Sequence, residues 1–321
     1  MTPPSARSPA IDVVRVLALV FIVFRHTFVV PLDEQSILFS WTVPFFFFLT
    51  GWLWKPGGRT VREEAERRWS SLGLPYVSWF AIIWITFLVT SLVSDSVDLS
   101  RLLKPFAGSV HAARPFTTFW FISALFFVAV LYRLIDRLAM IAQLGIAILL
   151  LAAGWAVGPL LSKLPLSIGT ATVCLAFVIF GRFFKNFASN VTSRLALIAM
   201  SVVLLAILAS PVIPPIDVKY GFYGALLVSA CVSLALCWAV IILASFLFDK
   251  APRAAAAVQR PARMLTSVAM CVILTHPFVL YLLGATQADA RWWHYLVALI
   301  VPWALGLALV RTPIRKYLIG G

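Results

Sequence analysis

Charged residues are scarce in this 321-residue chain: Asp, Glu, Lys and Arg make up 12% of it, about half the share that is usual in soluble proteins. Hydrophobic residues make up 62%, and the mean hydropathy is +0.99. This composition excludes an ordinary soluble domain and predicts an all-α polytopic membrane protein.

Residues that bind metals or form disulfides are also few. The four cysteines lie inside apolar runs without CxxC spacing, which indicates small buried side chains and no disulfide framework. The four histidines lack ligand spacing, and carboxylates are rare in the apolar runs, so we expect no metal cofactor.

Ten apolar runs are expected as transmembrane helices. They cover residues 11–31, 36–54, 72–94, 116–135, 139–159, 167–184, 194–213, 221–248, 264–284 and 293–312. We predict a disordered tail at 1–10 and one transmembrane domain at 11–321, with no signal peptide. The loop at 94–115 has apolar residues at helical spacing, which predicts an amphipathic segment on the membrane surface.

The positive charge of the chain, +14 overall, follows membrane topology. Of 26 Lys and Arg residues, eighteen fall in the termini and loops of one predicted side, six in the loops of the other, and two within a span. The positive-inside rule therefore predicts cytoplasmic termini and a multi-pass protein of the cytoplasmic (plasma) membrane. The same distribution argues against nucleic-acid binding.

The first span is unusually charged, because it contains Asp12, Arg15, Arg25 and His26. Each Asp or Arg near the centre of a span costs roughly 2.5–3.5 kcal/mol on insertion scales. The eleven-residue step from Arg15 to His26 puts both on one helix face, about 16 Å apart along the axis. Asp12, one turn before Arg15, is expected to pair with it, whereas Arg25 points elsewhere and receives no role.

His26 has two interpretations. A neutral imidazole in a partly buried cavity can accept a proton from a hydroxyl that attacks an acyl thioester. Alternatively, His26 is hydrogen-bonded to a neighbouring helix and has no chemical role. Arg15 on the same face favours the functional interpretation, either as a clamp for an anionic part of a donor or as the charge that orients the site.

The pattern Asp-x-x-Arg followed by ten residues and then His resembles the opening of the membrane-bound acyltransferase-3 family of integral-membrane O-acyltransferases. Further segments resemble that family in the same order: Val43–Trp54 (VPFFFFLTGWLW), Arg67-Arg68 with Leu74-Pro75-Tyr76, Phe119–Ile122, and Ile273–Pro277 (ILTHP). The resemblance covers nearly the whole chain.

The resemblance implies that Arg15 and His26 are the catalytic pair. It implies transfer of an acyl group, most simply acetyl from cytoplasmic acetyl-CoA, to a hydroxyl of an envelope carbohydrate or lipid-linked acceptor. The O-acetylation that the resemblance implies would modify carbohydrate at the cell envelope. The expected partners are the acceptor and membrane lipids. Whether the protein forms a homodimer is left open.

Arg67 and Arg68 are the expected acyl-CoA-binding residues. Family members usually carry an Arg-x-Arg pair here, whereas Trp69 and Ser70 follow Arg68 in this chain. Arg67 is therefore expected to replace the second arginine. The alternative is a solvated helical face with internal ion pairs.

His276 and Trp120 are supporting candidates. His276 lies at mid-span, and Pro277 beside it removes a backbone hydrogen bond and frees a carbonyl, which suits a polar site. Trp120 is a candidate for lining an acyl channel, or it serves packing alone. His111 and His294 are expected at the surface.

The main rival function is a transporter or flippase without acyl-transfer chemistry, in which Arg15, His26 and His276 bind or relay ions. The sequence lacks the repeated halves and broken span pairs that many transporters have.

Overall fold

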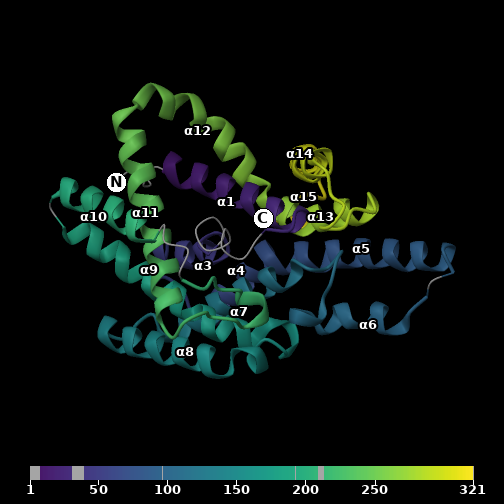
Figure 1. The fold of residues 1–321 in the computed structure, drawn as a ribbon, viewed down its shortest axis with the longest axis horizontal. Helices are drawn as coiled ribbons and strands as arrows, with labels where there is room; N and C mark the ends of the chain where they lie inside the picture. The colour runs from purple at the N-terminus through teal and green to yellow at the C-terminus, as the bar shows by residue number, and fades with distance from the viewer. Residues whose placement is uncertain (1–7, 31–39, 96, 192, 209–212, 321) are drawn as a thin grey trace.

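The computed structural model describes residues 8–30, 40–95, 97–191, 193–208 and 213–320, and within these ranges the chain is all-α (Figure 1). The helices are α1 (Pro9–Thr27), α3 (Thr42–Trp52), α4 (Val61–Arg68), α5 (Leu74–Val93), α6 (Leu99–Ala107), α7 (Phe119–Ile135), α8 (Met140–Leu161), α9 (Ile168–Asn190), α10 (Arg194–Leu208), α11 (Val228–Lys250), α12 (Pro252–Ser267), α13 (Ala269–Leu282), α14 (Trp292–Leu309) and α15 (Arg315–Leu318).

A helix occupies each of the ten ranges that were predicted to span a membrane. Among the described residues, five helices are long and apolar enough to cross a bilayer, and the pair α12–α13, bent by 63°, makes a sixth if it counts as one span. The helices α3 and α7 are apolar but shorter, with 11 and 17 residues. The chain is therefore a helical protein with several membrane-spanning helices, and length and composition do not establish the count of ten.

The first helix, α1, is surrounded by other helices although it is charged. It packs against α3, α11, α12, α13 and α14, and Figure 1 shows α12 alongside it. Its buried residues include Val14, Ala18, Leu19 and Val23 together with Asp12. Neighbouring helices thus supply the partners that lipid would not give to its polar side chains.

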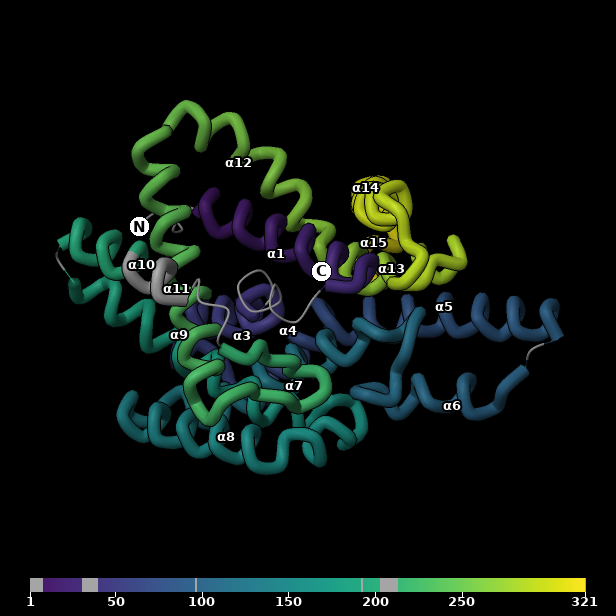
Figure 2. Tube along the Cα trace, in the orientation of Figure 1, coloured from purple at the N-terminus to yellow at the C-terminus, as the bar shows by residue number. Residues whose placement is uncertain are grey.

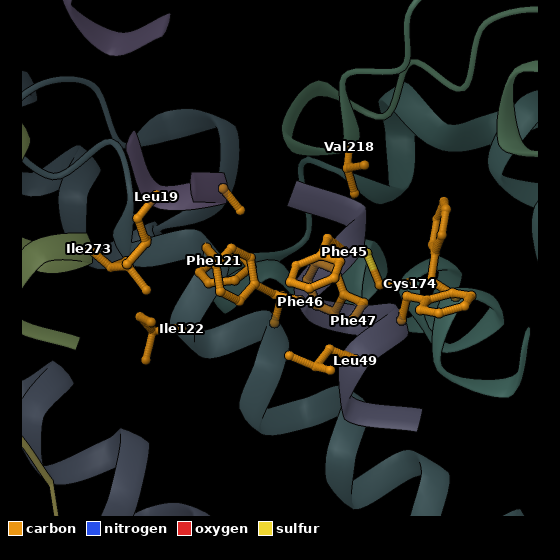
Figure 3. Packing of buried hydrophobic residues seen from close by; sticks show 14 of the residues in the cluster. Leu19, Phe45, Phe46, Phe47, Leu49, Phe121, Ile122, Cys174, Val218 and Ile273 are labelled. Atoms are coloured by element: carbon orange, nitrogen blue, oxygen red, sulfur yellow. The ribbon is translucent and has the colours of Figure 1, made fainter. Parts of the chain in front are cut away.

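The phenylalanine run of α3 forms the centre of the core. Phe45, Phe47 and Phe48 are fully buried, and Figure 3 shows this region. The helix α3 approaches α9 closely through Gly51 and Gly181: a Cβ atom on Gly51 would lie 1.8 Å from the Val178 carbonyl oxygen. The absence of a side chain at these positions lets the two backbones touch.

Three segments differ from the sequence-based predictions or refine them. The tail predicted as disordered lies outside the described residues up to Arg7, but Pro9 and Ala10 already belong to α1, with Pro9 in its first turn. The basic segment 249–263, which lies between two predicted spans and was therefore expected as a loop, is instead mostly helical, because α12 occupies most of it. The helix expected within 94–115 is α6, which runs beside α5 (Figure 2) and accepts a hydrogen bond from Trp84 at the Leu102 carbonyl.

Candidate functional site

The helix α1 carries its two candidate residues to two different cavities. Arg15 lines a cavity of about 550 Å³, here called the arginine cavity. His26 lines a second cavity of about 780 Å³, here called the histidine cavity. None of the described residues lines both, so the predicted pair is divided between two spaces at successive levels of one helix.

The arginine cavity has a strongly cationic lining. Besides its one carboxylate, Glu64, it is lined by six cationic side chains: Arg15, Lys55, Arg59, Arg67, Arg68 and Arg133. The two residues expected to bind acyl-CoA, Arg67 and Arg68, are therefore brought into one cavity with Arg15. Arg59, Arg133 and Lys55 were not predicted to belong to this site.

Glu64 organises the arginines around it. Its side chain is fully buried and accepts hydrogen bonds from Arg67 at 2.9 Å and Arg68 at 2.8 Å. Arg133 lies 3.3 Å and Arg59 3.5 Å from its second carboxylate oxygen. One carboxylate thus holds four guanidinium groups in place, while leaving the cluster with excess positive charge.

Local helix geometry explains how α4 presents these residues. Thr60 caps the helix, and its side chain and that of Glu63 form a capping box. Glu64, Arg67 and Arg68 then follow at positions i, i+3 and i+4 on one face. The alternative interpretation, a solvated helical face with internal ion pairs, applies to the outer face of α4. There Arg62 and Glu66 form an exposed ion pair at 2.8 Å.

Arg133 reaches the cavity from α7, although the sequence analysis gave it no role there. Its guanidinium lies 4.4 Å from the centre of a Trp54 ring and 2.6 Å from Asp136. Trp54 in turn donates a hydrogen bond to Asp136 at 2.9 Å. The only sequence signal was an arginine at the end of an apolar run, which the positive-inside pattern already explained.

The expected pairing of Asp12 with Arg15 is present, at 3.7 Å. Asp12 also accepts a hydrogen bond from the Thr266 hydroxyl, 3.2 Å away on α12. Asp12 is 3% exposed, and its two contacts connect Arg15 on α1 with Thr266 on α12.

The histidine cavity contains His26, Trp120 and three cationic side chains: Arg25, Arg114 and Lys219. Arg25, which received no role, forms an ion pair with Asp217 at 3.0 Å. Arg114 donates hydrogen bonds to the backbone carbonyls of His26 and Ala285, and so fixes the end of α1. The sequence analysis missed Arg114 and Lys219, because each is a cation in a loop between predicted spans, without a motif around it.

Lys219 is buried at the edge of this cavity, in the segment before α11. Its ammonium donates hydrogen bonds to the Ala112 carbonyl at 2.9 Å and the Thr117 hydroxyl at 2.8 Å. Burial lowers the pKa of Lys219 to about 8, and the charge of Asp217 opposes this shift only in part.

His276 lies beside His26, with ring centroids 5.1 Å apart. Its Nδ1 is 2.8 Å from the Val272 carbonyl, which makes Nδ1 the donor and leaves Nε2 as an acceptor. Nε2 is buried and has no hydrogen-bond partner within the described part of the chain. The structure therefore brings the supporting histidine to the candidate base.

Pro277 has the effect that was expected of it. Its ring nitrogen cannot bond to the Ile273 carbonyl one turn earlier in α13. That carbonyl instead accepts a hydrogen bond from the Thr118 hydroxyl at 2.7 Å. The proline thereby frees a buried acceptor that holds the start of α7 against α13.

The other two histidines lie away from this pair. His111 is 3.3 Å from the Lys163 carbonyl in a loop. The prediction that His294 is a surface residue is wrong, because it is 8% exposed and its Nδ1 accepts a hydrogen bond from the Arg291 backbone at the start of α14. In the described ranges, no three His, Cys, Asp or Glu side chains gather as a metal site would require.

These features define a multi-pass helical membrane protein in which one helix joins a polycationic cavity to a cavity with paired histidines. The sequence model of the acyltransferase-3 family, an acyltransferase domain, matches residues 8–311. The match covers nearly the whole chain, so the protein belongs to this family and is an acyltransferase. No curated protein and no solved structure matched the chain.

Proposed function

We propose that the protein transfers an acyl group, most simply acetyl, from cytoplasmic acyl-CoA to a hydroxyl of an envelope carbohydrate or lipid-linked acceptor. The observation that carries this proposal is the division of α1 between two cavities. Arg15 lies with five other cations in one cavity, and His26 lies about 16 Å farther along the helix in the other.

The arginine cavity suits the donor. Coenzyme A carries a pyrophosphate and a ribose phosphate, and guanidinium groups bind phosphate through paired charge-assisted hydrogen bonds. Arg59 and Arg67 have side chains that are 44% and 45% exposed, so both remain accessible to an incoming phosphate while Glu64 holds them.

The histidine cavity suits the acceptor and the chemistry. The acceptor hydroxyl gives its proton to the His26 imidazole as its oxygen bonds to the thioester carbonyl carbon. The carbon–sulfur bond then breaks, and the departing thiolate takes a proton from the imidazolium, which yields an ester and free CoA. Trp120 and Tyr220, also in the lining, offer aromatic faces to a sugar ring.

His276 is proposed as a positioning residue for His26. Its Nε2 is buried without a hydrogen-bond partner among the described residues, and the His26 ring lies 5.1 Å from its own ring, centroid to centroid. A hydrogen bond from one ring nitrogen of His26 to this acceptor would leave the other as the base.

Both termini are proposed to be cytoplasmic in the plasma membrane, which puts the arginine cavity on the donor side. A reporter fused after Gly321 should then be cytoplasmic, and one inserted near Ala107 external. A reversed result at either position would contradict the predicted topology.

The proposal is tested with purified protein in nanodiscs, given labelled acetyl-CoA and an extract of envelope glycans and lipids. Labelled ester and free CoA in equal amounts are expected. Two cavities without a common lining residue also fit a transporter, so a parallel assay measures flux of the same extract into liposomes. Flux without any ester would favour the transporter.

A further inference from the structure

An aromatic layer separates the two cavities. Phe46 and Phe121 line the arginine cavity, whereas Trp120, the neighbour of Phe121 on α7, lines the histidine cavity. The rings of Phe46 and Phe121 meet edge to face at 5.5 Å, and those of Trp120 and Phe121 at 5.9 Å. These three residues are 6–8% exposed, and their ring contacts run from the wall of one cavity to the wall of the other.

The layer is thin. Arg15 lines one cavity and Ile22 the other, and seven residues of α-helix span about 10 Å. Leu19, between them on α1, is 1% exposed, and it belongs with Ile273 to the same buried cluster as both phenylalanines (Figure 3).

We propose that Phe121, together with Phe46, is a gate that admits small unbranched acyl groups and rejects bulky ones. This inference rests on the proposed function. Because the phosphates of the donor bind among the arginines, its acyl end must enter the layer first, followed by the narrow pantetheine arm. An acetyl group needs little more width than that arm, whereas an aryl group needs the space that the Phe121 ring occupies.

The layer has a chemical reason to be closed in the resting protein. If the path were open, water from the histidine cavity would reach the thioester and hydrolyse the donor before transfer. Phe47 also contacts Phe121, at 5.4 Å, so three other rings pack against Phe121. The packing of these rings therefore favours the closed arrangement, and the gate closes again after transfer.

The test compares acetyl-CoA with benzoyl-CoA, whose phenyl ring matches the volume that Phe121→Ala removes. Release of free CoA is measured in nanodiscs with envelope extract. Wild type should use acetyl-CoA strongly and benzoyl-CoA poorly, and Phe121→Ala should raise the benzoyl-to-acetyl rate ratio at least about tenfold. Phe126→Ala, on the same helix but lining neither cavity, should leave the ratio unchanged.

Phe121→Leu serves as the second variant, because it keeps most of the apolar volume if Phe121→Ala fails to fold. It should raise the ratio by a smaller factor. A ratio unchanged in the folded variants, or a wild type that uses benzoyl-CoA as readily as acetyl-CoA, would overturn the gate and leave acyl transfer standing. A wild type that releases CoA from neither donor would overturn the proposed function itself.

Discussion

The imidazole rings of His26 and His276 lie 5.1 Å apart with their planes at 61°, although 250 positions separate them in the sequence. His26 lies in the last turn of α1, and His276 lies in α13 beside Pro277. Because Val272 fixes the donor nitrogen of His276, its other nitrogen is a defined acceptor next to the proposed base.

Replacing the proposed base should stop the chemistry and spare the fold. We expect His26→Ala to lower acyl transfer about 10²–10⁴-fold, the usual contribution of a positioned base. Arg15→Lys should also lower acyl transfer, because the ammonium group of Lys cannot form the two parallel hydrogen bonds of a planar guanidinium. His111→Ala is the matched control, because His111 lies in a loop outside both cavities. Near-normal transfer by His26→Ala would refute the mechanism.

Neutralising the predicted donor-binding pair should weaken acyl-CoA binding. The double change Arg67→Gln and Arg68→Gln removes two charged hydrogen-bond donors, so the KM for acyl-CoA should rise at least about tenfold and depend less on salt. Arg62→Gln, on the exposed face of the same helix, controls for a general loss of charge. An unchanged KM in the double variant would return α4 to a solely structural role.

Lys219 should make the stability of the protein depend on pH. Its pKa falls from 10.5 to about 8 on folding, so between those values the unfolded chain holds a proton that the folded protein has released. Stability therefore rises as the pH increases from about 8 to 10.5. The melting temperature of wild type should therefore rise relative to that of Lys219→Met as the pH increases over this window. Parallel curves for the two proteins would contradict burial of the charged form.

The contact between α3 and α9 should not tolerate a methyl group. In Gly51→Ala the new Cβ would lie 1.8 Å from the Val178 carbonyl oxygen, so the helices must separate. We expect a cost of about 1–3 kcal/mol, typical of overpacking. Gly145→Ala in α8 is the control, because nothing lies within 4 Å of its Cβ position. Equal melting temperatures for the two variants would show that α3 and α9 are not packed this closely.

Much of the membrane architecture could be read from local composition. Apolar runs long enough to span a bilayer must form helices, because lipid offers no partners to backbone groups, and a helix occupies each range that was predicted. The ion pair of Asp12 with Arg15 followed from their spacing, and the freed carbonyl next to His276 followed from Pro277, because both effects act within one turn of helix.

Only the tertiary structure decided what these residues meet. No spacing rule relates Glu64 to Arg133 or His26 to His276, because contacts between distant helices depend on how all of the helices pack. The separation of Arg15 and His26 into two cavities has the same origin: helix periodicity put both on one face, but the helices packed around α1 form two cavities that share no described lining residue.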